Sequence, residues 1–339
     1  MSVLWAVIVF CIIIFIHEFG HFITAKMCGV TVHEFAIGMG PKLASFTKNN
    51  TRYSIRILPI GGYVQLEGEN GESADPNAFG NKSAIKRFIV LVSGAFMNFV
   101  LGFVFFVIIS ANMNVIPTQY IGSLTENSAL AEAGALVGDK IIKMESENTS
   151  ANIVCYDDIS FFGYLSEYAP CTVTVKRGNE KIKLDVTPKY NEQEKRYLFG
   201  FSPMTVDKTV FNVLSDGFKQ SIFTVKTVFK SFAMLIGGKI SSNDVSGPVG
   251  IVKEIGNASK YGILSVLSLA GLISVNLGVV NLLPIPALDG GRILFIIIEK
   301  IRRKRLTPEQ EGIIHTVGFA LLMLVMLLVT FFDIKKLFG

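Results

Sequence analysis

The sequence predicts a polytopic α-helical membrane protein with about four transmembrane helices, a membrane-associated β-hairpin and one extracytoplasmic α+β domain. Three observations support this prediction. Hydrophobic residues make up 50% of the 339 residues and charged residues only 17%, which is below the share in ordinary soluble proteins. Four apolar stretches are long enough to cross a bilayer. A polar segment of domain size lies between the second and the third stretch.

The four apolar stretches lie near residues 3–26, 88–110, 263–288 and 313–332. A transmembrane helix needs about 20 apolar residues to cross a hydrocarbon core of about 30 Å, so each stretch is long enough. The first stretch could instead be a cleaved signal peptide. No Lys or Arg precedes it and no small-residue cleavage site follows it, so we expect a retained helix.

The basic residues predict the orientation in the membrane, because cytoplasmic loops near membrane ends accumulate Lys and Arg. They cluster between the first two stretches and between the last two, at Lys26, Lys42, Lys48, Arg52, Arg56, Lys82, Lys86, Arg87, Lys300, Arg302, Arg303, Lys304 and Arg305. We expect both loops in the cytoplasm, which leaves both termini and the polar segment outside. The net charge of +5 mostly reflects these loops, so nucleic-acid binding is not indicated.

A short β-hairpin is expected between the first two stretches. Its defining residues are Tyr53, Ile55, Ile57, Gly61, Gly62 and Tyr63. The first three alternate with polar residues, and the two glycines permit a sharp reversal. Unpaired strand edges are costly in lipid, so we expect the hairpin to pack on the helices or to line a wet cavity. A surface hairpin in the cytoplasm is the alternative.

The polar segment at 112–206 has the pattern of a small α+β domain. Its expected strands and helices, separated by Gly, Asn and Asp, lie at 141–146, 171–177, 181–188, 128–134 and 157–165. The stretch 127–142, with a helix, a Gly-Asp turn and a strand, resembles the PDZ pattern, and we expect one PDZ domain. Cys155 and Cys171 fall in this segment, and their spacing leaves a disulfide open.

Residues 207–236 predict an amphipathic helix. Lys219, Lys226 and Lys230 interrupt the apolar pattern at helical spacing, so they fall on one face. Three lysines in lipid would each cost about 2.5–3.5 kcal/mol, which argues against a fifth span. We expect the helix to lie on the membrane with this basic face on anionic lipid, and a linker helix is the alternative. The regions of the chain are therefore 1–111 (two spans and the hairpin), 112–206 (the PDZ-like domain), 207–262 (the surface helix and a linker) and 263–339 (the last two spans).

The motif HEFGH at residues 17–21 indicates zinc chemistry. Residues four apart on a helix lie about 40° apart around its axis, so His17 and His21 can bind one Zn²⁺. Glu18 can take a proton from zinc-bound water and pass it to a leaving amine. These groups are costly within a span, which favours a functional site. Histidines that only hydrogen-bond neighbouring helices are the alternative.

A catalytic zinc needs a third protein ligand and an open position. Asp289 is the best candidate, because it is acidic and follows two prolines that disrupt helical bonding in the third stretch. Asn281 could hold a substrate carbonyl or an oxyanion, or could bond between helices. We assign neither His33 nor His315 to the metal, and expect interhelical or interfacial roles for them.

These motifs together resemble the site-2 protease family, in particular its RseP/RasP-type bacterial branch (peptidase family M50B). The resemblance rests on HEFGH in the first stretch, NLLPIPALDGG at 281–291 and the PDZ-like domain between the second and third stretches. The blocks IRILPIGGYVQLEGE, SAIKRFIVLVSGAFMNF and GPVGIV also look like those of the family, so nearly the whole chain is covered. Members with two PDZ domains differ from this chain, in which we count one.

The resemblance implies an intramembrane zinc metalloendopeptidase of the bacterial inner membrane. Its substrates would be single-span membrane proteins, either anti-sigma factors in regulated intramembrane proteolysis or remnant signal peptides. It assigns zinc to His17, His21 and Asp289 and the base to Glu18. The hairpin would pair with the substrate as an added strand. The PDZ domain would exclude substrates that have not yet been trimmed.

Two other classes of function stay open on the sequence alone. Polar residues in membrane spans also serve transporters and ion channels, although the four stretches show no inverted repeat. A catalytically idle adaptor could bind peptide ends through the PDZ-like domain. A metal that only stabilises the fold, without catalysis, is a further alternative, but it would not need Glu18.

Overall fold

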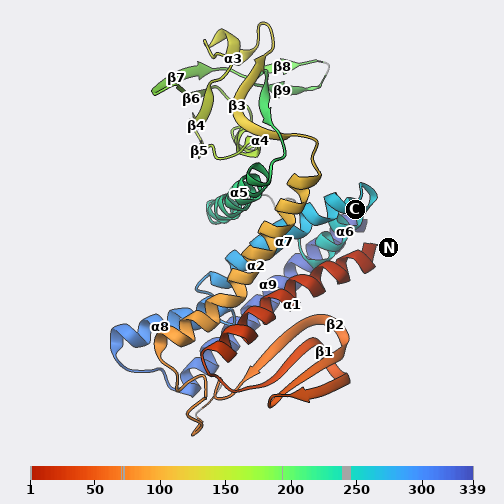
Figure 1. The fold of residues 1–339 in the computed structure, drawn as a ribbon, viewed down its shortest axis with the longest axis vertical. Helices are drawn as coiled ribbons and strands as arrows, with labels where there is room; N and C mark the ends of the chain where they lie inside the picture. The colour runs from red at the N-terminus through yellow and green to blue at the C-terminus, as the bar shows by residue number, and fades with distance from the viewer. Residues whose placement is uncertain (1, 70, 72, 193, 239–245, 339) are drawn as a thin grey trace. The chain divides into compact units, whose positions relative to one another are not determined.

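The computed structural model describes residues 2–69, 71, 73–192, 194–238 and 246–338 (Figure 1). The chain forms two compact units, one from Met1–Phe105 together with Thr227–Gly339, the other from Phe106–Lys226. The boundaries fall inside two helices, α2 (Ala84–Asn112) and α5 (Val210–Ile236). Each unit is described by itself below.

Four helices among the described residues are long and apolar enough to cross a membrane, as the sequence predicts. They are α1 (Ser2–Met27), α2, α7 (Ile263–Leu282) and the greater part of α9 (Pro308–Phe338). Large hydrophobic side chains remain exposed along them, most of all on α9, which is the expected surface for contact with lipid. Buried side chains from α1, α7 and the shorter α6 (Pro248–Lys260) form one apolar cluster between these three helices.

The third span is shorter than the sequence predicts. Helix α7 ends at Leu282 rather than near 288, and a separate helix, α8 (Asp289–Arg302), begins after a turn. The sequence NLLPIPALDGG explains the break, because each proline lacks a backbone N–H and disfavours helix in the residue before it. Asp289 is consequently the first residue of a new helix, where the helix dipole favours a carboxylate.

Strands β1 (Val32–Lys48) and β2 (Thr51–Leu66) form one long, bent hairpin that contacts α1 (Figure 1). Asn49 and Asn50 at its tip both have positive φ angles, 51° and 58°, as a two-residue type I′ turn requires. The first half of β1 pairs on both sides. Phe35, for example, faces Tyr53 on one side and Val64 on the other.

The predicted hairpin was therefore correct in place but wrong in pairing. The segments 53–59 and 63–66 do not pair with each other across Gly61-Gly62, because β1 lies between them. The segment 62–66 pairs with β1 on one side only, and no other strand of the described chain pairs with its second side. We call 62–66 the edge segment.

The Phe106–Lys226 unit is an α+β fold around a six-stranded sheet of order β10-β3-β4-β6-β7, with β5 paired to β4. Its elements are β3 (Ile116–Leu124), α3 (Ala129–Glu132), β4 (Lys140–Ser146), β5 (Ser150–Asn152), α4 (Tyr156–Leu165), β6 (Cys171–Arg177), β7 (Glu180–Val186), the ribbon β8 (Lys189–Asn191) with β9 (Arg196–Leu198), and β10 (Phe201–Val206). The predicted strands β4, β6 and β7 and both predicted helices are confirmed. Strand β3 contains Pro and Gly, and strand β10 contains Pro and polar residues. Neither strand was predicted.

Cys155 and Cys171 are free thiols, both buried within this unit. Burial raises the pKa of Cys155 to about 12 and that of Cys171 to about 11, because the thiolate would lose its hydration. Both thiols are therefore protonated at neutral pH and react slowly in disulfide exchange.

Helix α5 binds α4 through its polar face within the same unit. The Lys226 ammonium donates hydrogen bonds to Asp158 Oδ1 at 2.5 Å and to the Asn152 carbonyl at 2.6 Å. Gln220 Nε2 donates to Asp157 Oδ2 at 2.5 Å. The expectation that Lys226 rests on lipid is wrong, since its ammonium is held by a buried carboxylate. Apolar side chains occupy the exposed face instead, among them Phe211, Leu214 and Phe218.

The two ends of the chain meet at α6. The buried Asp333 carboxylate, near the end of α9, accepts hydrogen bonds from the backbone N–H groups of Gly247 (3.1 Å) and Gly250 (2.8 Å). It therefore caps the N-terminus of α6, whose free N–H groups need an acceptor. At the other end of the chain, Ser2 packs against Gly256 so closely that a Cβ there would lie 2.3 Å from the Ser2 hydroxyl.

Candidate metal centre

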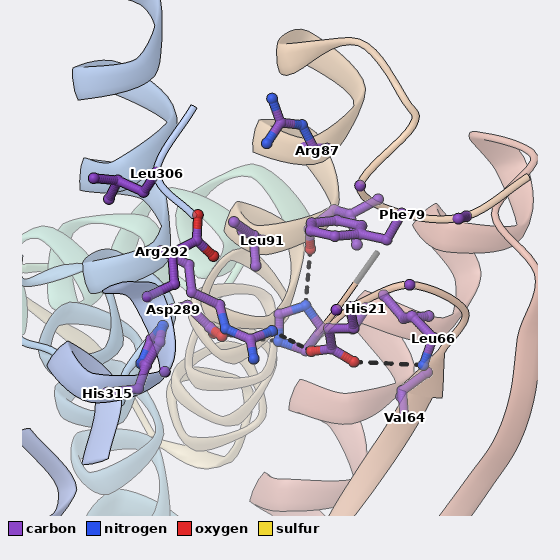
Figure 2. A pocket seen from close by; sticks show the side chains of 18 of the residues that line it. His21, Val64, Leu66, Phe79, Arg87, Leu91, Asp289, Arg292, Leu306 and His315 are labelled. Atoms are coloured by element: carbon purple, nitrogen blue, oxygen red, sulfur yellow. Dashed lines mark hydrogen bonds and ion pairs between the residues drawn. The ribbon is translucent and has the colours of Figure 1, made fainter. Parts of the chain in front are cut away.

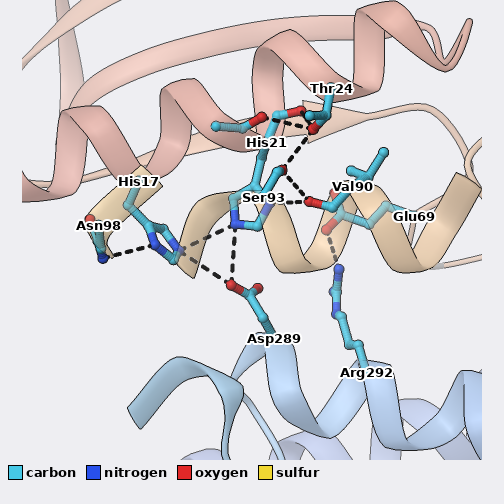
Figure 3. Close-up of polar contacts among 10 residues, drawn as sticks. His17, His21, Thr24, Glu69, Val90, Ser93, Asn98, Asp289 and Arg292 are labelled. Atoms are coloured by element: carbon cyan, nitrogen blue, oxygen red, sulfur yellow. Dashed lines mark hydrogen bonds and ion pairs between the residues drawn. The ribbon is translucent and has the colours of Figure 1, made fainter. Parts of the chain in front are cut away.

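Helices α1 and α8 bring three ionisable side chains together. His17 and His21 lie four residues apart on α1, and their Nε2 atoms are 3.2 Å from each other. Asp289 Oδ2 lies 3.3 Å from Nε2 of His17 and 3.2 Å from Nε2 of His21 (Figure 3). The two histidines and the aspartate are the predicted ligand set, and one donor atom from each lies within 4.8 Å of the others.

The chemistry of this cluster fits a cation. His21 Nδ1 lies 2.8 Å from the Val90 carbonyl, so Nδ1 carries the proton and Nε2 presents a lone pair towards Asp289. Asp289 Oδ2 is buried and has no hydrogen-bond partner. Three lone pairs that converge in this way form the His₂-carboxylate ligand set of catalytic zinc sites.

Asn98 on α2 fixes the second imidazole. Its amide Nδ2 lies 3.2 Å from His17 Nδ1, while its Oδ1 is buried without a partner. If the amide is turned by 180°, Oδ1 accepts from a protonated His17 Nδ1, which leaves Nε2 of His17 with a lone pair for a metal. Hydrogen bonds of this kind orient ligand histidines and raise their basicity.

We expect Asn98→Ala to weaken zinc binding by about 10- to 100-fold, the usual effect of losing a partner to a ligand histidine. Competition with a chelator of known affinity measures it on the purified protein. Asn112→Ala is the matched control, because Asn112 lies on the same helix and donates only to the Ile108 carbonyl in its own helix. Equal zinc affinity in the two variants would contradict the role of Asn98.

The turn between α7 and α8 places Asp289 through close backbone contacts. A Cβ at Gly290 would lie 2.0 Å from the Leu283 carbonyl oxygen, so only glycine fits there. Ala287 has a φ of 74°, which is uncommon for a residue with a side chain. Its N–H donates to His315 Nδ1 at 3.0 Å, so a side chain of α9 supports the turn. His315 thus has an interhelical role, as the sequence analysis expected.

A cavity of about 1170 Å³ opens onto the cluster. Its lining includes the two histidines and Asp289, Glu18, and Tyr63, Val64 and Leu66 of the edge segment (Figure 2 shows part of it). Gly62 lies against the side chain of Glu18, since a Cβ at Gly62 would be 3.3 Å from Glu18 Cγ. The edge segment is therefore part of the cavity wall, and Glu18 lines the same cavity in contact with it.

Several predicted substrate-binding residues lie elsewhere. Ile55 and Ile57 are on the segment of β2 that does not line the cavity, and both are more than half exposed. Gly61 is also outside the lining, and Asn281 is buried near the end of α7 without reaching the cavity wall. Of the predicted hairpin residues, Tyr63 lines the cavity and Gly62 contacts Glu18.

The contribution of α2 to this site was not predicted from the sequence. A Cβ at Gly94 would lie 2.3 Å from His21 Nε2 and 2.8 Å from His17 Cε1, so α2 approaches both imidazoles at a glycine. Asn98 follows one turn later. A small residue and an amide at a spacing of four within a span are typical of close helix contacts, and this signal was present in the sequence.

Comparisons with known proteins show the family of this chain. Residues 5–325 match the model of peptidase family M50. A protein of Clostridium acetobutylicum described as a zinc metalloprotease is 39% identical over 98% of this chain and 97% of its own. A protein of Fusobacterium nucleatum with the same description is 38% identical over the whole of both chains. The regulator of sigma-W protease RasP of Bacillus subtilis is 30% identical over 99% of each chain. The chain belongs to peptidase family M50 and is a multi-pass membrane zinc metalloprotease of the site-2 protease type.

Proposed function

We propose that this protease cleaves the transmembrane segments of single-span proteins, with zinc held by His17, His21 and Asp289 and with Glu18 as the catalytic base. One observation supports this above all others. The three candidate ligands and Glu18 share a cavity with an unpaired strand edge, among helices apolar enough to span a membrane. An adaptor needs no such arrangement.

Each side chain has a defined task in this proposal. Bound Zn²⁺ supplies a Lewis acid that polarises the substrate carbonyl and makes water a nucleophile near neutral pH. The Glu18 carboxylate takes a proton from the attacking water and passes it to the leaving amide nitrogen. Asn98 and the Val90 carbonyl hold the imidazoles in the tautomer that leaves both Nε2 atoms free.

The edge segment explains how a helical substrate becomes accessible. Hydrogen bonds within a helix shield its peptide bonds, so a transmembrane substrate has to be unwound before it is cut. An extended chain can add to the edge segment through backbone hydrogen bonds, and this replaces the bonds lost by the helix. The contact of Gly62 with Glu18 brings such an added strand next to the base.

The surroundings follow from the same proposal. We place the chain in the bacterial inner membrane, with the basic loops in the cytoplasm and both termini outside. The 112–206 segment also lies outside. It is proposed to be a PDZ domain that excludes untrimmed substrates. The exposed apolar face of α5, rather than its lysine face, rests on the bilayer. Anti-sigma factors and remnant signal peptides are the proposed substrates. The Bacillus subtilis relative is named a regulator of sigma-W protease, which supports the former.

We expect Glu18→Gln to lower cleavage by about 10²- to 10⁴-fold while zinc content stays near one per chain, because the substitution removes the base and no ligand. The purified protein is reconstituted with zinc in vesicles that contain a single-span substrate, and products are identified by mass spectrometry. Glu309→Gln is the matched control, since Glu309 is exposed at the start of α9.

Cleavage by Glu18→Gln at the rate of the control would contradict the role of Glu18. Absence of cleavage in the wild type with every single-span substrate, at full zinc occupancy, would contradict the proposed substrate class. Zinc-dependent ion flux that persists in Glu18→Gln would instead favour a transporter.

A further inference from the structure

The end of the edge segment is already occupied by a side chain of the protein. Glu67 donates its N–H to the Thr31 carbonyl on the β1 side at 3.0 Å. Successive N–H groups of a strand point in opposite directions, so the Leu66 N–H points to the free side. There it donates to Glu69 Oε2 at 3.4 Å. The carboxylate takes the place that a carbonyl of an added strand would occupy.

Arg292 holds this carboxylate in position. Its guanidinium is paired with Glu69 Oε1 (Figure 3), and both side chains are about three-quarters buried. Arg292 lies on α8 three residues after Asp289, so the helix that carries the candidate zinc ligand also anchors Glu69. Glu69 and Arg292 both line the cavity.

Displacing this carboxylate would be unfavourable for an incoming strand. A neutral peptide carbonyl makes a weaker hydrogen bond than a carboxylate, and removing Glu69 would also leave the partly buried Arg292 without this partner. An added strand can therefore pair along the edge from Gly62 but meets a charged acceptor that is already in place at Leu66. Because Glu69 has a fixed position relative to Glu18, it limits how far the added strand can extend along the edge segment.

We propose that Glu69, anchored by Arg292, is a stop that sets the register of the substrate strand on the edge segment and thereby selects which peptide bond lies beside Glu18. The pair acts through the position of the substrate and takes no part in proton transfer. This inference rests on the proposed function, because it needs a substrate that pairs with the edge segment.

Register gives the proposal a specific signature. Side chains alternate between the two faces of a strand, so a strand that slips while keeping the same side chains towards the cavity moves by two residues. Loss of the stop should therefore produce cleavage two residues away from the wild-type bond. A purely structural role for the ion pair would change the rate and leave the bond unchanged.

The test compares the cleavage positions of the wild type, Glu69→Ala and Arg292→Gln, each reconstituted in vesicles with one single-span substrate. We expect the ratio of displaced to original product to rise by about tenfold or more in both variants, the factor that corresponds to losing one charged hydrogen bond. Glu69→Gln keeps an acceptor oxygen but loses the charge, so we expect a smaller rise in displaced product than in Glu69→Ala. Mass spectrometry of the products gives the positions.

Glu299→Gln is the matched control. Glu299 on α8 is paired with Arg87 on α2 and with Arg305, so the substitution also breaks an ion pair beside the cavity but does not touch the edge segment. We expect altered rates and an unchanged bond. Zinc content and circular dichroism confirm that each variant is folded.

If Glu69→Ala and Arg292→Gln both cleave the same peptide bond as the wild type, the proposed stop is wrong, whatever their cleavage rates. A complete loss of cleavage in both folded, zinc-loaded variants also overturns it, because the pair would then be needed for catalysis rather than for register. A wild type that fails to cleave contradicts the proposed function instead, which separates the two failures.

Discussion

His21→Ala and Asp289→Ala are each expected to lose zinc and, with it, cleavage. Each substitution leaves two protein ligands where a catalytic zinc needs three, and the Lewis acid supplies several kcal/mol to the transition state. At about 1.36 kcal/mol for each factor of ten, the rate should fall by about 10³-fold or more. Zinc content by elemental analysis and cleavage in vesicles are measured on the same samples.

His33→Ala is the matched control for His21→Ala. His33 is paired with Glu67 and lies outside the candidate metal centre, so its loss should leave zinc content unchanged. Near-stoichiometric zinc in His21→Ala or in Asp289→Ala would remove that residue from the ligand set. The contrast with Glu18→Gln, which should keep zinc, separates ligands from base.

Gly94→Ala is expected to impair zinc binding with no change of charge or of any ligand. The added methyl group would lie 2.3 Å from His21 Nε2, so the imidazole or α2 must move. Overpacking of this kind costs about 1–3 kcal/mol, which corresponds to about 10- to 100-fold in zinc affinity. Chelator competition gives the affinity, and cleavage should fall with it.

Gly312→Ala is the control for a methyl group added to a helix. Gly312 also lines the cavity, but a Cβ there meets nothing within 4 Å, and alanine favours helix over glycine. We expect zinc affinity equal to that of the wild type. If Gly94→Ala bound zinc as tightly as Gly312→Ala, the close approach of α2 would have no bearing on the metal centre.

The geometry of the candidate metal centre was largely predictable because its signals are local. Histidines four apart on a helix necessarily share a face, and an acidic residue after two prolines was the best carboxylate in the later spans. The position of Asp289 at the start of a separate helix was not predicted. That position depends on the backbone contacts around Gly290, which link residues on both sides of the turn.

The sheet beside α1 was harder to predict, because its register depends on long-range pairing. Segment 32–48 contains Gly38, Gly40 and Pro41, which are typical of loops. In the structure both glycines have positive φ angles and lie within strand β1. Periodicity alone also could not show that one half of β1 pairs on both sides. The salt bridge of Glu69 with Arg292 joins residues 223 positions apart, a separation at which sequence pattern carries no information.

The capping of α6 by Asp333 has a practical consequence for handling this protein. A chain shortened before Asp333 would lose the acceptor for two N–H groups of α6, a loss that costs about 0.5–2 kcal/mol at a helix N-terminus. Ser2 packs against the same helix, so a fusion that displaces the first residues would disturb it from the other end. Affinity tags and reporter fusions therefore belong behind a flexible spacer at either terminus, or in an exposed loop between strands of the Phe106–Lys226 unit.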